Sequence, residues 1–332
     1  MTAPISCTHP SRARRAVLAL AASLLVAGGA AAQSYPSQPI RLIVPFPPGG
    51  PTDVASRLIG QQLEARLRQP VIVENRPGAS GRIGVALAAK SPPSYTLVAV
   101  TNSTINEQLG RETAGAPSSA AGLLPVSTLF TTPVALLVNR QAVPADTLAQ
   151  YVAMARDKPG AISFGSSGEG TTTHFFGELL KRDKQIDITH VPFAGEGPNL
   201  TGLLGGHVGS AFLSASGATK AAQTGKTQVL AVTTPGGSPL LPGVPSFAQL
   251  GVAGLDRDTW VGLYAPAGTP QPVLDRVAQA VSDALSSPAV RERYAQLGLI
   301  AEGGSPQDLA RRMEDDRQYW TQAVQRTGIS LR

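Results

Sequence analysis

The sequence contains 332 residues, of which 42% are hydrophobic and 15% are charged. This composition is typical of a folded globular protein, and the length favours about two domains. The formal net charge is +6, but no basic run with interleaved aromatic residues occurs, so we expect no binding to nucleic acid. The single cysteine, Cys7, excludes a disulfide framework.

The first 32 residues have the pattern of a secretory signal peptide. Three arginines precede an apolar run at residues 16–27 that is too short to span a membrane, and small residues precede Gln33. We therefore expect export to the periplasm, with the signal peptide cleaved near Ala32. Cleavage would remove Cys7 and the three arginines, leaving 25 basic and 22 acidic residues and a net charge of +3.

Hydrophobic periodicity predicts strands that alternate with helices along most of the chain, which indicates parallel βαβ units. The predicted strands are residues 40–44, 70–74, 95–100, 126–130, 134–138, 162–164, 188–191, 211–213, 229–232 and 260–265. The predicted helices include residues 52–67, 83–90, 147–156, 174–181, 270–285, 288–297 and 306–327. Residues 110–122 are rich in glycine, alanine, proline and serine, and we expect a loop there.

The order of these elements predicts two domains after the signal peptide of residues 1–32. The chain is expected to cross between domains near residues 131–133 and to return near residues 256–260. The first domain then comprises residues 33–132 and 257–332, and the second comprises residues 133–256.

Two glycine-rich turns, at residues 47–53 and 166–172, each join a predicted strand to a predicted helix. A helix N-terminus presents free N–H groups and the positive end of the helix dipole, which suit a carboxylate or a phosphate. Taken alone, such a glycine-rich turn is better explained by an ordinary connection with a capping Thr or Asp. If the turns belong to separate domains, they can face each other across a ligand cleft.

Motifs for catalysis and metal binding are incomplete. Residues 165–169 resemble a nucleophile elbow, but Glu169 stands where the second glycine belongs. His174, His190 and His207 have no acidic or cysteine neighbours at ligand spacing, so we expect no metal and no cofactor.

Three residues of the two turns have alternative interpretations. His174 either donates to a bound anion or braces the second turn. Asp53 contacts a ligand or, as we prefer, caps its own helix. Glu169 would repel an anion, and we expect its side chain to point to solvent.

Several short segments, in this order and spacing, resemble the Bug-type receptors, the extracytoplasmic solute receptors of tripartite tricarboxylate transporters. The resemblance extends from residue 35 to about residue 329. It rests on Tyr35-Pro36, residues 39–50 with Asp53, residues 69–78, residues 165–168 with Gly170, Thr171 and His174, residues 190–193, Gly205-Gly206, and residues 260–263 with 265–270.

The resemblance implies an α/β fold like that of the type II periplasmic binding proteins, with two α/β domains, a hinge and an interdomain ligand cleft that closes like a Venus flytrap. The implied function is that of a monomeric receptor, not an enzyme, which binds a small organic carboxylate and delivers it to integral-membrane transporter subunits. The ligand-binding residues that it implies are Pro48, Gly49, Gly50, Thr52, Asp53, Ser166, Ser167, Gly168, Thr171, His174, Phe193, Ala194 and Gly195.

The sequence departs from the family pattern at residues 212–217, where the family usually has an acidic or amide pair. Leu213 cannot pair with a ligand ammonium, so we favour a di- or tricarboxylate, or a carboxylate with an apolar or aromatic body, over an amino acid. Ser214 is a further candidate ligand contact, although a helix cap is an equal explanation.

Two alternative functions remain open on the sequence. An exported serine hydrolase would use Ser167 or Ser80, and would need a histidine that a carboxylate orients. A sensor or scaffold derived from the same fold would need no ligand transport.

Overall fold

The computed structural model describes residues 35–78, 81–104 and 122–327. The predicted signal peptide, Ser80 and nearly all of the predicted loop at residues 110–122 lie outside these residues. Gln38–Arg332 form one compact unit, whose fold is described here. In the described part of the chain, no helix combines the length and the apolar character needed to cross a bilayer.

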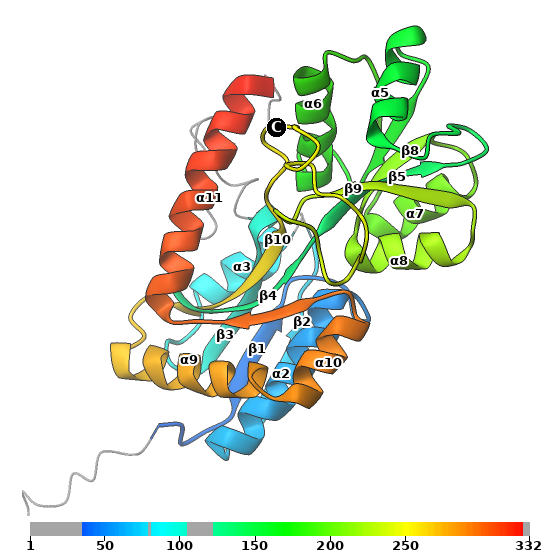
Figure 1. The fold of residues 1–332 in the computed structure, drawn as a ribbon. Coiled ribbons are helices and arrows are strands. Elements are labelled where there is room, and N and C mark those ends of the chain that lie inside the picture. The colour runs from blue at the N-terminus through cyan, green and yellow to red at the C-terminus, as the bar shows by residue number, and fades with distance from the viewer. Residues whose placement is uncertain (1–34, 79–80, 105–121, 328–332) are drawn as a thin grey trace, which may run out of the picture. The chain divides into compact units, whose positions relative to one another are not determined.

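The first of two β-sheets has six strands in the order β11-β4-β10-β3-β1-β2 (Figure 1). β1 pairs in parallel with β2 and β3, whereas β10 runs antiparallel to β3 and β4, and β11 antiparallel to β4. The strands are β1 (Ile40–Val44), β2 (Val71–Asn75), β3 (Thr96–Thr101), β4 (Leu123–Thr132), β10 (Thr259–Pro266) and β11 (Ile300–Gly303). The helices that follow these strands are α2 (Pro51–Leu67), α3 (Arg82–Ala89), α9 (Gln271–Leu285) and α10 (Pro288–Gln296). We call this sheet with its helices the first lobe.

The second sheet has five strands in the order β7-β6-β8-β5-β9. β6 is parallel to β7 and β8, and β5 is antiparallel to β8 and β9. The strands are β5 (Val134–Asn139), β6 (Ser163–Ser166), β7 (Thr189–Pro192), β8 (Ser210–Ser214) and β9 (Thr227–Val232). Its helices are α5 (Leu148–Asp157), α6 (Thr172–Lys184), α7 (Glu196–Leu204) and α8 (Ala215–Gln223). We call this sheet with its helices the second lobe.

Both sheets are mixed: the predicted parallel βαβ units are present in β1–α2–β2 and β6–α6–β7, whereas β4, β5, β9, β10 and β11 pair in antiparallel fashion. Pro133 is the only residue between β4 and β5, so the chain runs directly from the first sheet into the second. The chain returns to the first sheet through β10. Each sheet therefore contains a long strand that continues towards the other lobe and lies antiparallel to its neighbours. β11 is a strand that the sequence analysis did not assign, since it lies between two predicted helices.

The second lobe is built around β5, an apolar strand buried along its whole length. Successive side chains of a strand point to opposite faces. Leu136 accordingly packs with Tyr151 and Phe176 on one face, and Leu137 packs with Leu203 on the other. A strand covered on both faces has no polar side, which is why its sequence is a continuous apolar run.

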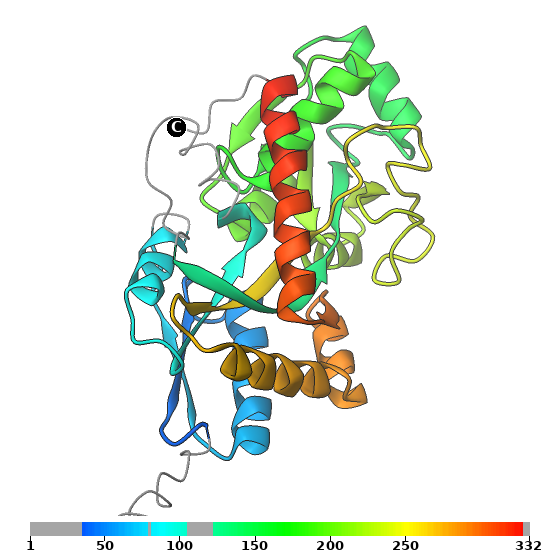
Figure 2. The same ribbon diagram turned by 90° about the vertical axis from the view of Figure 1, so that its left-hand side faces the viewer.

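The last helix, α11 (Pro306–Thr327), contacts both lobes (Figures 1 and 2). Its first turn contributes Leu309 to the core of the first lobe, beside Val85 and Trp260. Further along, Trp320 packs against Phe175 and Phe176 of α6, with ring centroids 5.4 and 5.9 Å away. The helix therefore connects the two lobes, and the domain bounds expected from the sequence stay a prediction.

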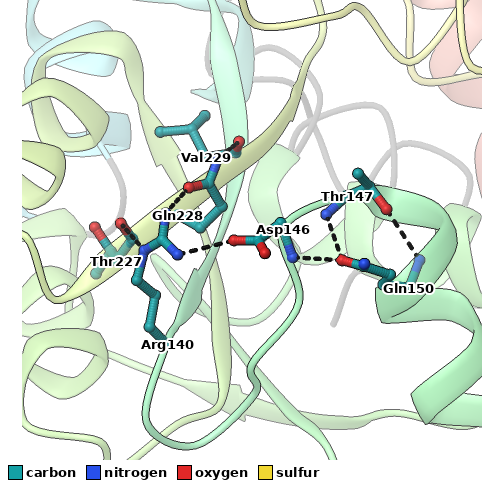
Figure 3. Close-up of polar contacts among 7 residues, drawn as sticks. All are labelled: Arg140, Asp146, Thr147, Gln150, Thr227, Gln228 and Val229. Atoms are coloured by element: carbon teal, nitrogen blue, oxygen red, sulfur yellow. Dashed lines mark hydrogen bonds and ion pairs between the residues drawn. The ribbon is translucent and has the colours of Figure 1, made fainter.

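A polar network fixes the start of α5 against the second sheet (Figure 3). Thr147 caps the helix, because its hydroxyl accepts from the Gln150 N–H at 3.2 Å and the Gln150 side chain accepts from the Thr147 N–H at 3.2 Å. Arg140, which follows β5, donates to Asp146 at 2.8 Å and also contacts Gln228 of β9. The loop after β5 is therefore tied to both α5 and β9.

Candidate functional site

A cavity of about 260 Å³ lies between the two sheets and is lined by residues of both lobes. Several of these residues belong to the first turns of α2, α6, α7 and α8, and others follow the carboxyl end of β3. The polar lining residues are Thr52, Thr101, Asn102, Ser103, Thr132, Ser167, Thr171, Thr172, Thr173, Glu196, Ser214, Ser216 and Thr259. The remainder of the described lining is Pro51, Phe130, Val134, Trp260, Val261, Leu297 and Leu299.

The first glycine-rich turn leads into α2 as the sequence predicted, with Gly50 as the N-cap and Pro51 in the first turn. Gly49 has a φ of 86°, in the region that favours glycine. Thr52 and Pro51 line the cavity, whereas Pro48 and Gly49 are exposed and Gly50 is half-buried outside the lining. Of the five residues predicted in this turn, the structure brings only Thr52 to the cavity.

Asp53 braces the first turn from within. Its carboxylate accepts from the Gly49 N–H at 2.9 Å, from Asn75 Nδ2 at 2.8 Å and from Arg57 Nε at 3.1 Å. Burial by itself would raise the pKa of Asp53, but the hydrogen bonds from Arg57, Gly49 and Asn75 together lower it below its ordinary value. Asp53 is 2% exposed and does not line the cavity. Gly50 is the N-cap of α2 and no side chain caps the helix, so Asp53 braces the turn before the helix and does not have the preferred capping role.

The second glycine-rich turn runs from β6 to α6. The Ser167 N–H donates to the Thr173 hydroxyl at 3.0 Å, and the Thr171 hydroxyl donates to the Gly168 carbonyl at 2.7 Å. These bonds hold three hydroxyl-bearing residues at the start of α6, and Ser167, Thr171 and Thr173 all line the cavity. Ser166 is fully buried beneath them, and Gly168 lies outside the lining.

Two histidines, His174 and His190, support this turn on the side away from the cavity lining. The rings of His174 and His190 stack with centroids 3.8 Å apart. His174 Nδ1 accepts from the Gly170 N–H at 3.1 Å, and His190 Nε2 is hydrogen-bonded to Ser166 Oγ at 2.7 Å. Neither ring lines the cavity, so the structure shows His174 bracing the turn. Glu169 is exposed, as expected.

Burial lowers the pKa of both histidines. For His190, burial, the positive charge of a protonated His174 and the charge of Lys181 lower the pKa to about 4. The pKa of His174 is also lowered, chiefly by burial, although Glu169 opposes the shift. Both rings are therefore neutral at physiological pH and bring no positive charge to the cavity.

The predicted residues after β7 have structural roles in the second lobe. The Phe193 ring lies against α7 so closely that a Cβ at Gly202 would be 2.5 Å from it. Gly195 is the N-cap of α7 with a φ of 108°, and Ala194 is exposed. None of these three residues lines the cavity, whereas Ser214 does.

Ser214 is also the N-cap of α8, because its hydroxyl accepts from the Gly217 N–H at 3.2 Å. The adjacent Leu213 is fully buried in the core of the second lobe and does not line the cavity. The residue at position 213 therefore does not determine the charge of the cavity. The acidic residue that lines it is Glu196, which the sequence analysis did not single out.

The two lobes meet at the cavity. Ser103, just after β3 of the first lobe, is hydrogen-bonded to Thr172 of α6 with their hydroxyl oxygens 3.1 Å apart. Both residues line the cavity. The carboxyl end of β3 and the amino end of α6 thus lie at hydrogen-bonding distance across the gap between the lobes. In α/β sheets, ligand-binding loops follow the carboxyl ends of the parallel strands. This rule could have identified Asn102 and Ser103 from the sequence, because both residues follow β3.

A buried carboxylate orients one wall of the cavity. Asp316 of α11 accepts from Trp260 Nε1 at 2.7 Å and from Asn102 Nδ2 at 3.3 Å. Burial raises the pKa of Asp316, although these two hydrogen bonds oppose the shift. Since Trp260 and Asn102 both line the cavity, Asp316 fixes the positions of two lining side chains without lining it itself.

Charge in the lining is sparse. Among the described residues, Glu196 is the only charged side chain that lines the cavity. An anion bound there would be held by N–H groups and hydroxyls at helix N-termini, since no lysine or arginine lines the described walls. The described residues also contain no group of three or more His, Cys, Asp or Glu side chains suited to a metal ion.

Two lobes with α/β sheets and a cavity between them define a periplasmic binding protein, and solved structures of that class share this fold. The chain belongs to the family described as the tripartite tricarboxylate transporter family receptor, whose model matches residues 55–329. The Bug-type resemblance is thereby confirmed. The family and the structural neighbours are substrate-binding receptors and not enzymes.

Similar proteins cover nearly the whole chain. Protein BugT of Bordetella pertussis is 31% identical over 309 residues, which are 92% of this chain and 94% of BugT. The structure of R. palustris Rpa4515 with adipate is 30% identical, with a TM-score of 0.78, and the match covers 89% of this chain and 99% of that chain. MatC from Rhodopseudomonas palustris with bound malate is 29% identical, with a TM-score of 0.75, covering 87% of this chain and 100% of that chain.

The arrangement gives no support to a serine hydrolase. The serine bonded to a histidine is Ser166, which is fully buried, and in the described residues neither His174 nor His190 is hydrogen-bonded to a carboxylate. Ser167, the predicted nucleophile, contacts Thr173 through its N–H.

Proposed function

We propose that the protein is a periplasmic receptor that binds a small organic carboxylate for a tripartite tricarboxylate-type transporter. The observation that carries the proposal is that the N-termini of α2 and α6, from different lobes, border the same cavity and present Thr52, Ser167 and Thr171–Thr173 to it. Hydrogen bonds to a charged group contribute about 1.5–3 kcal/mol each, so a few of them support micromolar affinity after the cost of closure.

The size of the cavity supports a small ligand. Its volume of about 260 Å³ is close to the lower end of the range for small-molecule sites. The ligand class proposed is a di- or tricarboxylate, or a carboxylate with an apolar or aromatic body. The candidate contacts are Thr52, Ser167, Thr171 and Ser214, which line the cavity, and Ser103 and Thr172, which we add from the structure.

The remaining features of the proposed function concern export and partners. We propose that residues 1–32 direct export and are removed near Ala32, and that the mature receptor acts as a monomer. Closure of residues 133–256 on residues 33–132 and 257–332 would then signal occupancy to integral-membrane transporter subunits. The relatives' family description, which names a transporter receptor, supports this assignment.

A thermal-shift and calorimetric screen of mono-, di- and tricarboxylates and aromatic acids tests the proposal. We expect at least one acid to raise the melting temperature with increasing concentration, because a ligand that binds only the folded state stabilises it. The corresponding amides, which lack the charge, should bind at least tenfold more weakly. Binding of no acid by either method would refute the proposal.

A double variant localises the binding site. S167A combined with T172V removes the hydroxyls of two candidate contacts at the start of α6 and should weaken acid binding by about 10- to 100-fold, the loss expected for a hydrogen bond to a charged group. S286A is the matched control, because its hydroxyl bonds to Ser282 at the end of α9, outside the cavity lining. Equal affinity of the double variant and the control would place the ligand elsewhere.

A further inference from the structure

Glu196 places a negative charge in a cavity that otherwise suits an anion. It is the first residue of α7 and lines the cavity together with the N-termini of α2, α6 and α8. Such a charge opposes the binding of any second negative group nearby. The position of this carboxylate therefore bears directly on the class of acid that the proposed receptor accepts.

The Glu196 carboxylate is held at the N-terminus of α8. Oε2 accepts from the Ser214 N–H at 3.0 Å, and Oε1 accepts from the Ser214 hydroxyl at 2.7 Å. A side-chain carboxylate of the protein thus takes the place at this helix end that a ligand carboxylate would otherwise occupy. The helix end of α8 is satisfied internally, whereas those of α2 and α6 present hydroxyls to the cavity.

The packing around Glu196 is close and leaves its carboxylate in a defined position. A Cβ atom at Gly217, in the first turn of α8, would lie 2.9 Å from Glu196 Oε1. Glycine at 217 therefore makes room for the carboxylate, and a larger residue would displace it.

The apolar side chains of the lining surround the part of the ligand that lies away from the helix N-termini. Phe130, Val134, Trp260, Val261, Leu297 and Leu299 line the cavity. These side chains offer no hydrogen-bonding partner to a second carboxylate, apart from the Trp260 N–H, which already donates to Asp316. Of the polar side chains that also line the cavity, those of Asn102, Thr132 and Thr259 already donate to Asp316, the Gly298 carbonyl and the Thr132 carbonyl. Burying a carboxylate against walls whose donors are already engaged is costly.

A second carboxylate also cannot move far from Glu196. A sphere with the volume of the cavity is about 8 Å across, no larger than the distance of ~8 Å over which physiological salt screens charges. Repulsion inside a protein cavity is also stronger than in water, because the effective dielectric constant is lower.

We infer that Glu196 acts as an internal anion that excludes a second ligand carboxylate, so that the receptor selects monocarboxylates with an apolar aliphatic or aromatic body. The inference rests on the proposed function and narrows its ligand class. The single ligand carboxylate binds at the N-termini of α2 and α6, and the body of the ligand packs on the apolar wall.

Hexanoate and adipate test this inference, because they have the same carbon chain and differ by one terminal carboxylate. Calorimetry on the full receptor should show hexanoate binding at least tenfold more tightly than adipate at pH 7.5. Benzoate and phthalate provide the same comparison with an aromatic body. Adipate binding as tightly as hexanoate would overturn the inference and leave the carboxylate receptor intact, whereas binding of no acid would overturn both.

The variant E196Q tests the residue itself. It keeps the shape of the side chain and one of the two acceptors for Ser214, replaces the other oxygen with an NH2 group and removes the charge. The preference for hexanoate over adipate should therefore fall at least fivefold, mainly through tighter adipate binding. E292Q is the matched control, because it makes the same change of net charge at an exposed position on α10. An unchanged preference in E196Q, with an unaltered melting temperature of the free protein, would exclude the assigned role.

Discussion

His174 and His190 show how individual side chains brace the second glycine-rich turn. Their stacked rings connect the Gly170 N–H to the buried Ser166 hydroxyl, and so join the two ends of the turn between β6 and α6. Two adjacent imidazoles can stack in this way only when they are not both charged. The integrity of the turn therefore depends on pH.

The pH dependence of stability should reveal this pair. The pKa of His190 is about 4 in the folded protein and about 6.5 in the unfolded chain. Its contribution is fully present above pH 6.5 and is lost as the pH falls towards 4, where the folded ring also becomes protonated. After discounting for partial exposure, we expect a loss of about 1–2 kcal/mol in the free energy of unfolding.

Urea denaturation of the wild type and H190Q between pH 4 and pH 7 measures this loss. H190Q should lack this part of the pH dependence, while H207Q, which removes a histidine outside the stack, should keep it. If the free energy of unfolding depended on pH in the same way in the wild type and in H190Q, His190 would not be the source of the pH dependence.

Residue roles in the turns were only partly predictable from the sequence. The motif at residues 47–53 indicated an anion site, but a motif cannot tell whether a carboxylate such as Asp53 points inwards or braces its loop. That distinction depends on Asn75 and Arg57, whose side chains reach Asp53 only in the folded chain. The sequence analysis did not identify Glu196 for the same reason, because its contact with Ser214 joins α7 to the start of α8 and forms only in the folded chain.

At the scale of elements, the capping box of α5 links a local sequence signal to the position of a whole helix. Thr147 and Gln150 satisfy each other's backbone N–H groups, and Gln150 also accepts from the Asp146 N–H at 2.7 Å. α5 contributes Leu148 and Tyr151 to the core of the second lobe. The cap therefore fixes where these two side chains enter the core.

The variant T147A should destabilise the protein by about 1 kcal/mol, the usual cost of losing a threonine N-cap. The midpoint of urea denaturation measures this change. T219A is the control, because Thr219 lies inside α8 and bonds back to the Ala215 carbonyl, so alanine there should cost little. Equal losses in both variants would mean that the cap contributes nothing of its own.

Most helices and strands were predictable, because their hydrophobic periodicity is strong, as in α9 with its buried Leu274, Val277 and Val281. The parallel pairs of β1 with β2 and β3, and of β6 with β7, follow the predicted βαβ units, but the antiparallel strands were not predictable. Antiparallel pairing of β10 with β3 and β4 arises from the return of the chain between lobes, which local periodicity does not record. β11 escaped prediction because its two apolar residues, Ile300 and Ala301, are followed by Glu302 and Gly303, so no apolar run marks the strand.

At the scale of the whole chain, α11 joins the two lobes through opposite ends. Leu309 is fully buried in the first lobe, while Trp320 is 2% exposed in the aromatic cluster of the second. Between them, Asp316 bonds to two cavity-lining residues. Any movement of one lobe relative to the other must therefore be accommodated along this helix.

The variant W320A should lower the free energy of unfolding by about 4 kcal/mol, because it leaves a large cavity beside Phe175 and Phe176. W320F should cost much less, since it keeps an aromatic ring and removes an indole N–H that has no partner in the described structure. Urea denaturation compares the two. Similar losses in W320A and W320F would show that ring packing is not what anchors the helix.

The N-termini of several helices border the cavity, so the proposed anion site would use their main-chain N–H groups beside the hydroxyls, and this has an evolutionary consequence. A point mutation can exchange an apolar wall residue such as Phe130 or Leu299, but it cannot delete a backbone amide unless it introduces proline. Descendants of this chain could therefore change the size and shape of the cavity step by step, while the main-chain part of the proposed carboxylate site persists.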